Sequence, residues 1–254
     1  MGLQEDRDFG SLDVTTNLME YLISMPTGLR EKIRNSWIYG RLNGPIFDLK
    51  GHLFDLYHGV KTMPQVRLED LDFENPNKSR GGHYAGTEPN YFRQMMATLD
   101  IRFEDFQFID FGSGMGRALL LASERPFKKI IGVEFSPELH AIADSNIRSF
   151  TKRKSRACND LESVCEDAAA FELPVAPLVL YLFNPFSREL FGRVIENIED
   201  SLRRTPREIL VIYANPVHND LFLGSNYFVE IDQGRWHTLH RSTTPDDDGS
   251  GTRP

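Results

Sequence analysis

Three glycines alternate with other residues directly after an apolar stretch, in the segment IDFGSGMGRALLLAS at positions 109–123. Gly112, Gly114 and Gly116 form a GxGxG turn between a predicted strand and a predicted helix. In a parallel sheet such a turn lies at the carboxyl edge, where ligands bind against backbone N–H groups. The pattern is weak by itself, because glycines also serve tight turns that bind nothing. Its interpretation depends on the charged residues around it.

Three carboxylates follow the ends of three predicted neighbouring strands. Asp110 lies at the end of the first strand, Glu134 ends the second and Asp167 closes the third. A buried carboxylate is costly without a partner, so these acids either stay solvated at the strand ends or face a ligand. A pyrophosphate would be repelled by this acidic rim, whereas a cationic nucleoside without phosphates would be attracted. The rim therefore favours a cationic ligand over a dinucleotide.

S-adenosylmethionine has this character. Its ammonium and sulfonium groups suit the neighbourhood of Asp110, and its methionine carboxylate suits the N-terminus of the helix that follows the glycine turn. Its ribose hydroxyls suit Glu134, because an acidic residue at the end of the second strand is the usual partner of a ribose.

The elements that position these residues alternate along the chain. Apolar segments predict strands, and segments with apolar residues at helical spacing predict helices between them. The predicted strands are 106–111, 129–135, 161–167, 177–184 and 208–215, with a hairpin over 226–243; the predicted helices are 116–124, 136–150 and 187–204. Strands that are apolar on both faces are typical of a parallel sheet between helices. We expect an α/β fold with a doubly wound, seven-stranded, mostly parallel sheet and an antiparallel C-terminal hairpin.

The regions on either side of this pattern differ from it. Residues 1–89 predict a helical and loop cap, with helices over 18–25, 29–42 and 45–59, and the core domain spans 90–243. The polar segment 244–254 predicts a disordered tail.

Composition and charge exclude several classes of function. The net charge is -8 and the pI about 5.4, which disfavours nucleic acid as a partner. The basic run TKRKSR at 151–156 is the best candidate for a local exception, and its alternative is a solvated helix end. Cys158 and Cys165 form no CxxC motif, so we expect no metal site and no disulfide framework. The acidic N-terminus and the lack of a long apolar run predict a cytoplasmic protein without a membrane span.

The segments FIDFGSGMGR, IIGVEFS, CEDAAAF and LVLYLFNPF resemble, in order and spacing, the class I S-adenosylmethionine-dependent methyltransferases. The resemblance covers about residues 84–216. Within this class, the chain is similar to a bacterial group of methyltransferases of unassigned substrate. The resemblance implies a seven-stranded sheet whose last strand is antiparallel. It also implies contacts to the cofactor. The methionine end would contact Asp110 and the glycine turn, which consists of Gly112, Ser113, Gly114 and Gly116 with Met115. The ribose would contact Glu134, and the adenine would contact Asp167 and lie between Phe135 and Ala168.

The acceptor side is predicted from Asn184, Pro185 and Phe186, which resemble part of the Asn/Asp-Pro-Pro-Tyr/Phe motif of amino-methyltransferases. There the amide and a carbonyl orient an acceptor nitrogen and the ring stacks on a planar substrate. The alternative is structural: Asn184 caps, and Ser187 begins the next helix. The resemblance further places Tyr84 or Thr87 over the methionine end of the cofactor.

The function that these observations favour is methyl transfer from S-adenosylmethionine, with a nitrogen acceptor on a small molecule or a protein. One alternative is an NAD(P)-dependent oxidoreductase, although the glycine pattern is not GxGxxG. Another is a scaffold of the same fold that binds the cofactor without transferring the methyl group. Arg117 directly follows the glycine turn, and the sequence leaves open whether it pairs with an acid of the rim or meets the substrate.

Overall fold

The protein is described by a computed structural model over residues 51–63, 66–67, 83–84, 86–151, 156–183, 186–234 and 236–243. All of these residues belong to one compact unit, Gly51–Pro254. The predicted helices at 18–25 and 29–42 and the predicted tail at 244–254 lie outside the described residues. The cap and its boundary therefore stay predictions.

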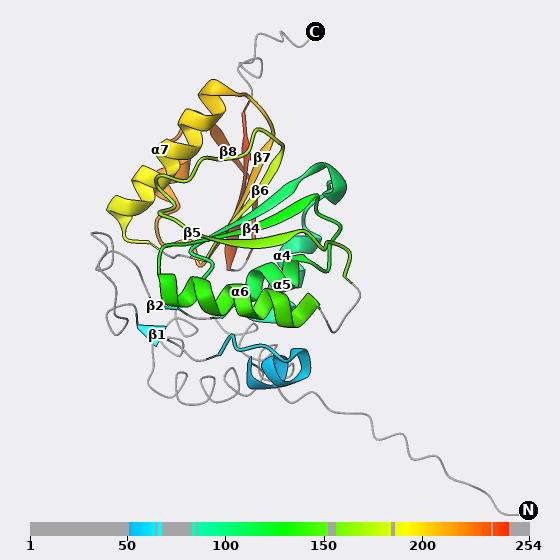
Figure 1. Cartoon of the computed structure of the whole chain (residues 1–254). Coiled ribbons are helices and arrows are strands. Elements are labelled where there is room, and N and C mark those ends of the chain that lie inside the picture. The colour runs from blue at the N-terminus through cyan, green and yellow to red at the C-terminus, as the bar shows by residue number, and fades with distance from the viewer. Residues whose placement is uncertain are drawn as a thin grey trace, which may run out of the picture. The chain divides into compact units, whose positions relative to one another are not determined.

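A seven-stranded sheet forms the centre of the unit (Figure 1). Its strands are β3 (Gln107–Phe111), β4 (Lys129–Glu134), β5 (Leu161–Cys165), β6 (Leu178–Phe183), β7 (Ile209–Ala214), β8 (Phe228–Gln233) and β9 (His237–Ser242). Their order is β5-β4-β3-β6-β7-β9-β8. Neighbours from β5 to β7 are parallel, while β9 runs antiparallel to both β7 and β8. The predicted doubly wound α/β sheet with an antiparallel C-terminal hairpin is confirmed.

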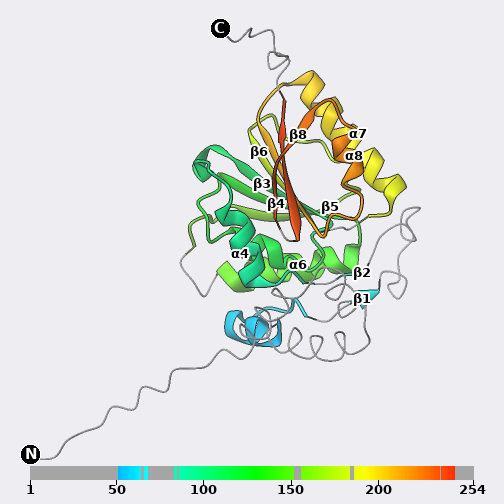
Figure 2. The ribbon, with the colours of Figure 1, turned by 180° about the vertical axis from the view of Figure 1, so that it is seen from behind.

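Helices cover both faces of this sheet (Figures 1 and 2). The helices α4 (Pro89–Ala97), α5 (Arg117–Ala122) and α6 (Pro137–Thr151) pack on one face, against Phe108 and Tyr181. The helices α7 (Arg188–Arg204) and α8 (Asp220–Leu223) pack on the other face, against Ile109 and Leu180. Each central strand thus sends alternate side chains into two apolar layers, which is why these strands lack a polar face.

Serine side chains define where two of the helices, α6 and α7, begin. Ser136 accepts a hydrogen bond from the Leu139 N–H at 3.3 Å, and Ser187 accepts one from the Leu190 N–H at 3.5 Å. Both serines cap their helices, since a hydroxyl satisfies an N–H group that the first helical turn leaves free. For Ser187 this agrees with the structural alternative for the acceptor motif.

Some short elements were not predicted. β1 (Val66–Arg67) and β2 (His83–Tyr84) form a separate antiparallel pair in a region predicted as loop. A 3-10 turn over Phe103–Asp105 precedes β3, and α8 is a single turn of helix. Residues 51–58 are helical, in agreement with the helix predicted over 45–59.

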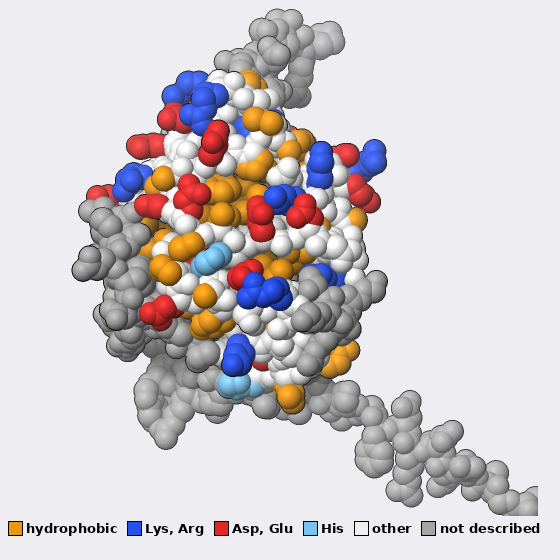
Figure 3. Space-filling view, in the orientation of Figure 1, with side chains coloured by type: hydrophobic (Ala, Val, Ile, Leu, Met, Phe, Trp, Pro, Cys, Tyr) orange, Lys and Arg blue, Asp and Glu red, His pale blue; other side chains and the backbone are white. Residues whose placement is uncertain are grey.

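The surface of the described part shows no single dominant charge on the face drawn in Figure 3. Acidic and basic side chains are interspersed there. Surface ion pairs of the described part include Arg203–Asp200 and Lys129–Glu162. Within the residues that the structure covers, no helix is both long and apolar enough to cross a bilayer.

Candidate functional site

The glycine turn leaves β3 at the carboxyl edge of the sheet and leads into α5. Gly112, Gly114 and Gly116 have φ angles of 76°, 54° and 83°. These lie in the left-handed region, which is strained for residues with a Cβ atom. The turn is held to the neighbouring strand because the N–H groups of Gly112 and Ser113 donate to the carbonyl of Val133 at 2.9 and 3.2 Å. The alternating glycines are therefore required by the backbone.

Asp110 lies on β3, two residues before this turn, and is 4% exposed. Burial raises the pKa of Asp110 well above its usual value, and the negative charge of Glu134 raises it further. Among the described residues, none forms a hydrogen bond or ion pair with its carboxyl group. A buried carboxyl group without a partner is rare in folded proteins and calls for an explanation. A cation that binds beside it would supply the missing partner.

Glu134 ends β4 and is 3% exposed. Its carboxylate accepts hydrogen bonds from the N–H groups of Gly114 and Ser136, each at 2.8 Å. Burial raises the pKa of Glu134, and these N–H donors oppose that rise. Glu134 therefore shapes the glycine turn, a role that the sequence did not indicate. Each carboxylate oxygen has a second lone pair, so a ribose hydroxyl can still donate to it.

A small pocket lies beside the turn, between the ends of β4, β5 and α7. It brings together four residues predicted for the cofactor, namely Gly112, Phe135, Asp167 and Ala168, with Val133, Glu166, Phe186 and Leu190. One oxygen of Asp167 accepts the Ala169 N–H at 2.9 Å, which fixes the carboxylate at the rim of the pocket. The lining has the chemistry that suits an aromatic ring with an amino group, namely apolar walls and a carboxylate acceptor. The pocket has a volume of only about 10 Å³ in this structure, so its walls must move apart before a ring can enter.

The acceptor motif is only partly described. Asn184 and Pro185 lie outside the described residues. Phe186 is 8% exposed and lines the pocket of Asp167 and Ala168. The structure thus joins Phe186 to the residues predicted for the adenine, and its stacking on an acceptor stays a prediction.

The segment before α4 reaches the same end of the sheet. Thr87 is buried, and its hydroxyl lies 3.2 Å from the hydroxyl of Tyr181. Tyr181 is the β6 neighbour of Asp110 in the sheet register, and its pKa is raised by burial and by the charge of Asp110. Thr87 therefore lies close to the unpartnered carboxyl group. Of Tyr84 only the backbone is described, in β2.

Ser113 is buried at the middle of the turn. Its hydroxyl has no hydrogen-bond partner within the described part of the chain. The hydroxyl fits there because Gly132 on β4 has no side chain: a Cβ atom would lie 2.7 Å from it.

Arg117 turns away from the acidic rim, which answers the question that the sequence left open. Its side chain is 2% exposed, and its Nε donates to the hydroxyl of Thr62 at 2.7 Å. Its Nη2 lies 3.6 Å from the carboxylate of Asp55. Asp55 also accepts the N–H groups of Thr62 and Met63, at 2.6 and 2.8 Å. Arg117 therefore ties the segment 51–63 to the helix that follows the glycine turn.

Asn146 of α6 makes a second tie between the same segment and the turn. Its amide oxygen accepts the Lys61 N–H at 2.8 Å, and its amide nitrogen donates to the carbonyls of Lys61 and Met115 at 2.8 and 2.9 Å. Met115 belongs to the glycine turn. Sequence reasoning missed Asp55, Thr62 and Asn146, and no local signal marks them.

Comparison with known families gives a match over residues 73–162. The matching family model is that of histone methylation protein DOT1. The match includes Asp110, the glycine turn and Glu134, and it ends before Asp167 and the acceptor motif. It agrees with the methyltransferase class predicted from the sequence. No curated protein sequence matches the chain.

Several solved structures resemble the fold. An RNA methyltransferase from Salinibacter ruber in complex with S-adenosyl-L-homocysteine has a TM-score of 0.43 and 18% identity, over 67% of this chain and 100% of that one. Magnesium protoporphyrin IX methyltransferase from Synechocystis PCC 6803 with bound SAM has a TM-score of 0.45 and 14% identity, over 60% and 76%. A predicted N6-adenine-specific DNA methylase from Listeria monocytogenes has a TM-score of 0.47 and 12% identity, over 63% and 52%. These values say nothing about the acceptor.

Proposed function

We propose that the protein is an S-adenosylmethionine-dependent methyltransferase. The observation that carries the proposal is the buried carboxyl group of Asp110, which has no partner among the described residues and lies beside a second buried acid, Glu134. The match to a histone methylation family over residues 73–162 supports it. A cationic ligand satisfies this acidic site, whereas the pyrophosphate of NAD(P) would face two buried acids.

In this proposal each part of the site contacts one part of the cofactor. Asp110 faces its ammonium and sulfonium groups, Glu134 accepts from its ribose hydroxyls, and Asp167 accepts from its adenine amino group. When bound, the cofactor supplies a methyl group on a cationic sulfur. The protein contributes orientation and exclusion of water, because a methyl transfer needs an in-line approach and little acid–base chemistry.

The acceptor is proposed to be a nitrogen atom, presented by Asn184, Pro185 and Phe186 on a small molecule or a protein. The amide of Asn184 would accept hydrogen bonds from the acceptor and hold its lone pair toward the methyl group. The histone named by the family model is not assigned to this chain, because the match ends before these residues. A cytoplasmic location stays a prediction.

Calorimetric titration tests the proposal directly. We expect S-adenosylmethionine and S-adenosylhomocysteine to bind the full chain with a stoichiometry of one, and NADH not to compete. Absence of binding by either adenosyl compound would overturn the proposal. Transfer of a labelled methyl group into lysate fractions then separates an enzyme from a scaffold, since a scaffold binds the cofactor and labels nothing.

A further inference from the structure

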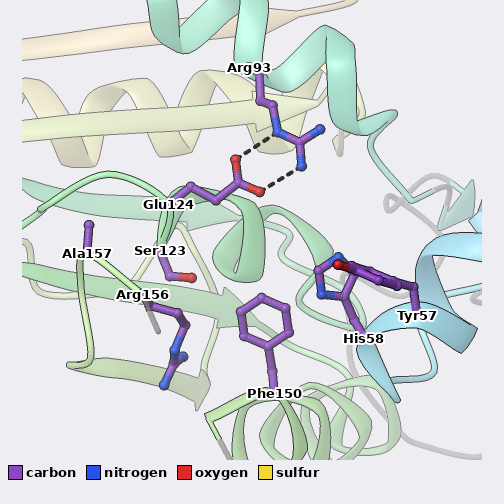
Figure 4. A pocket seen from close by; sticks show the side chains of 8 residues that line it. All are labelled: Tyr57, His58, Arg93, Ser123, Glu124, Phe150, Arg156 and Ala157. Atoms are coloured by element: carbon purple, nitrogen blue, oxygen red, sulfur yellow. Dashed lines mark hydrogen bonds and ion pairs between the residues drawn. The ribbon is translucent and has the colours of Figure 1, made fainter. Parts of the chain in front are cut away.

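A second pocket lies at the other ends of α5 and α6, away from the glycine turn (Figure 4). α5 begins at the turn and ends beside Ser123, and α6 begins after β4 and ends beside Phe150. At 1.5 Å per residue, the fifteen residues of α6 separate its two ends by about 20 Å. This far-end pocket has a volume of about 330 Å³ and is lined by Tyr57, His58, Arg93, Ser123, Glu124, Phe150, Arg156 and Ala157.

Two arginines line the far-end pocket, and only one of them is neutralised. Arg93 donates to both oxygens of Glu124, each at 2.7 Å, as the dashed lines in Figure 4 mark. The Nε and Nη1 of Arg156 are buried and have no hydrogen-bond partner. No carboxylate of the described residues pairs with Arg156, and burial lowers its pKa. Arginine stays charged in proteins, so this half-buried cation lacks an anion among the described residues.

The ends of the neighbouring helices do not supply this partner. The last carbonyl beyond α5, that of Ser123, already accepts the N–H groups of Ala157 and Cys158 at 3.0 and 3.2 Å. These two bonds also fix the backbone beside Arg156 to the end of α5. These bonds fix the backbone and not the guanidinium, whose Nε and Nη1 are enclosed without a partner, so the positive charge of Arg156 is not balanced by the end of α5. A buried donor without a partner destabilises the folded chain.

Aromatic rings form another wall of the pocket. The guanidinium of Arg156 lies 5.4 Å from the centre of the Phe150 ring, and the His58 ring lies 5.0 Å from the same ring. Figure 4 shows Tyr57 on the side of His58 that is away from Arg156. Such a wall suits a planar apolar group that is attached to an anion, because the rings can pack on the planar group while the guanidinium pairs with the anion.

Arg156 is the last residue of the basic run TKRKSR, which was the one candidate for a local basic patch. The proposed cofactor site does not use this run, and its residues 152–155 lie outside the described residues. The charge of Arg156 itself attracts an anionic ligand.

We propose that the far-end pocket binds a small oxyanion, a carboxylate or a phosphate monoester, that is attached to a planar apolar group. The guanidinium of Arg156 donates to the anion from Nη2, the one of its nitrogens that is not enclosed, and the planar group packs on Phe150. The site is separate from the cofactor site and does not depend on the proposed function.

Phenyl phosphate, benzoate and inorganic phosphate are the probes, each titrated into the full chain by calorimetry at low ionic strength. We expect phenyl phosphate or benzoate to saturate with a dissociation constant on the order of 1 mM or below, and inorganic phosphate to bind at least about tenfold more weakly. Arg156→Gln should weaken the binding of the aromatic probes at least about tenfold, and Arg156→Lys should weaken it less, because lysine keeps the charge and loses only the planar guanidinium.

Arg188→Gln is the matched control, since Arg188 is an exposed arginine paired with Asp220 on the other face of the sheet. It should leave all three titrations unchanged. Circular dichroism of each variant checks that it is folded. The proposal is overturned if neither aromatic probe saturates by about 10 mM, if folded Arg156→Gln binds them as the wild type does, or if inorganic phosphate binds as well as phenyl phosphate.

Discussion

The two ends of α5 and α6 contain buried charges of opposite sign that lack partners. At the carboxyl edge of the sheet the group is the carboxyl of Asp110, and in the far-end pocket it is the guanidinium of Arg156. Two other buried guanidinium groups have partners: Arg117 faces the carboxylate of Asp55, and Arg207 donates hydrogen bonds to the carbonyls of Ala176 and Thr205.

The two ends differ in the residues that surround the unpartnered group, and these residues determine which ligand each end can bind. Asp110 is fixed by strand register, between β4 and β6, and it has a second acid as neighbour. Arg156 is fixed by helix ends and has an aromatic neighbour. A cation suits the first end and an anion suits the second. Each prediction below changes one end and leaves the other as a control.

The largest effect is expected for Asp110→Ala. Loss of the buried carboxylate removes the partner of the cationic end of the cofactor, so the affinity for S-adenosylmethionine should fall by at least about 100-fold, since charged hydrogen bonds contribute about 1.5–3 kcal/mol each. Calorimetry measures it. Phenyl phosphate binding should not change, and Asp144→Ala, an exposed acid of α6, should leave both ligands unaffected. Affinity within threefold of the wild type would contradict the assignment of Asp110.

Gly114→Val should have an effect of similar kind. Gly114 has φ of 54°, which a β-branched residue adopts only with strain, and its N–H group is the donor to Glu134. The turn must shift, so we expect cofactor binding to be lost while the fold persists. Gly192→Ala is the control, because a Cβ atom there meets nothing within 4 Å. A Gly114→Val protein that binds normally would show that the turn does not contact the cofactor.

The pH dependence of thermal stability distinguishes the protonated from the ionised form of Asp110. Because the pKa of Asp110 is raised in the folded protein, its contribution to stability is fully present below the usual carboxyl value of about 4 and is lost as pH rises through the raised value. The cofactor prefers the ionised form, so its stabilising effect should grow over the same range. The Tm of wild type minus that of Asp110→Asn should therefore fall with pH without cofactor and become nearly independent of pH at saturating cofactor, because Asp110 is then ionised in both the bound and the unfolded protein. A difference that is independent of pH without cofactor would contradict the raised pKa.

The smallest effect is expected for Asp55→Asn, which weakens the tie between the segment 51–63 and Arg117. The cofactor affinity should fall several-fold and the Tm by a few degrees, because a charged partner of a buried guanidinium is lost while its shape is kept. Amide exchange at Met115 and Gly116 should become faster, even without cofactor. Unchanged exchange there would show that the tie does not support the turn.

Much of the fold was predictable because its signals are local. The apolar strands, the glycine turn and the capping serines Ser136 and Ser187 each lie within a few neighbouring residues. The order β5-β4-β3-β6-β7-β9-β8 follows from alternating strands and helices with right-handed crossovers. The strand pair β1–β2 was missed, because two-residue strands have no periodicity to read.

The sequence predicted which residues form the site better than it predicted which of them are in contact. The carboxylates at the strand ends were found because topology brings the ends of parallel strands to one edge. That Glu134 accepts from the N–H of Gly114, twenty positions away, depends on the register of β3 and β4. The place of Phe186 beside Asp167 depends on how α7 packs against β5.

The sequence by itself determined the fold class, the glycine turn and the acids around it, because periodicity and residue type act over short distances. Only the tertiary structure decided which charges are paired. Arg117 contacts Asp55 and Thr62 from a separate segment, and Asp110 forms no hydrogen bond or ion pair with a residue that the structure describes. Two enclosed donors of Arg156 have no partner. The physical reason is that burial and pairing depend on neighbours far away in the chain.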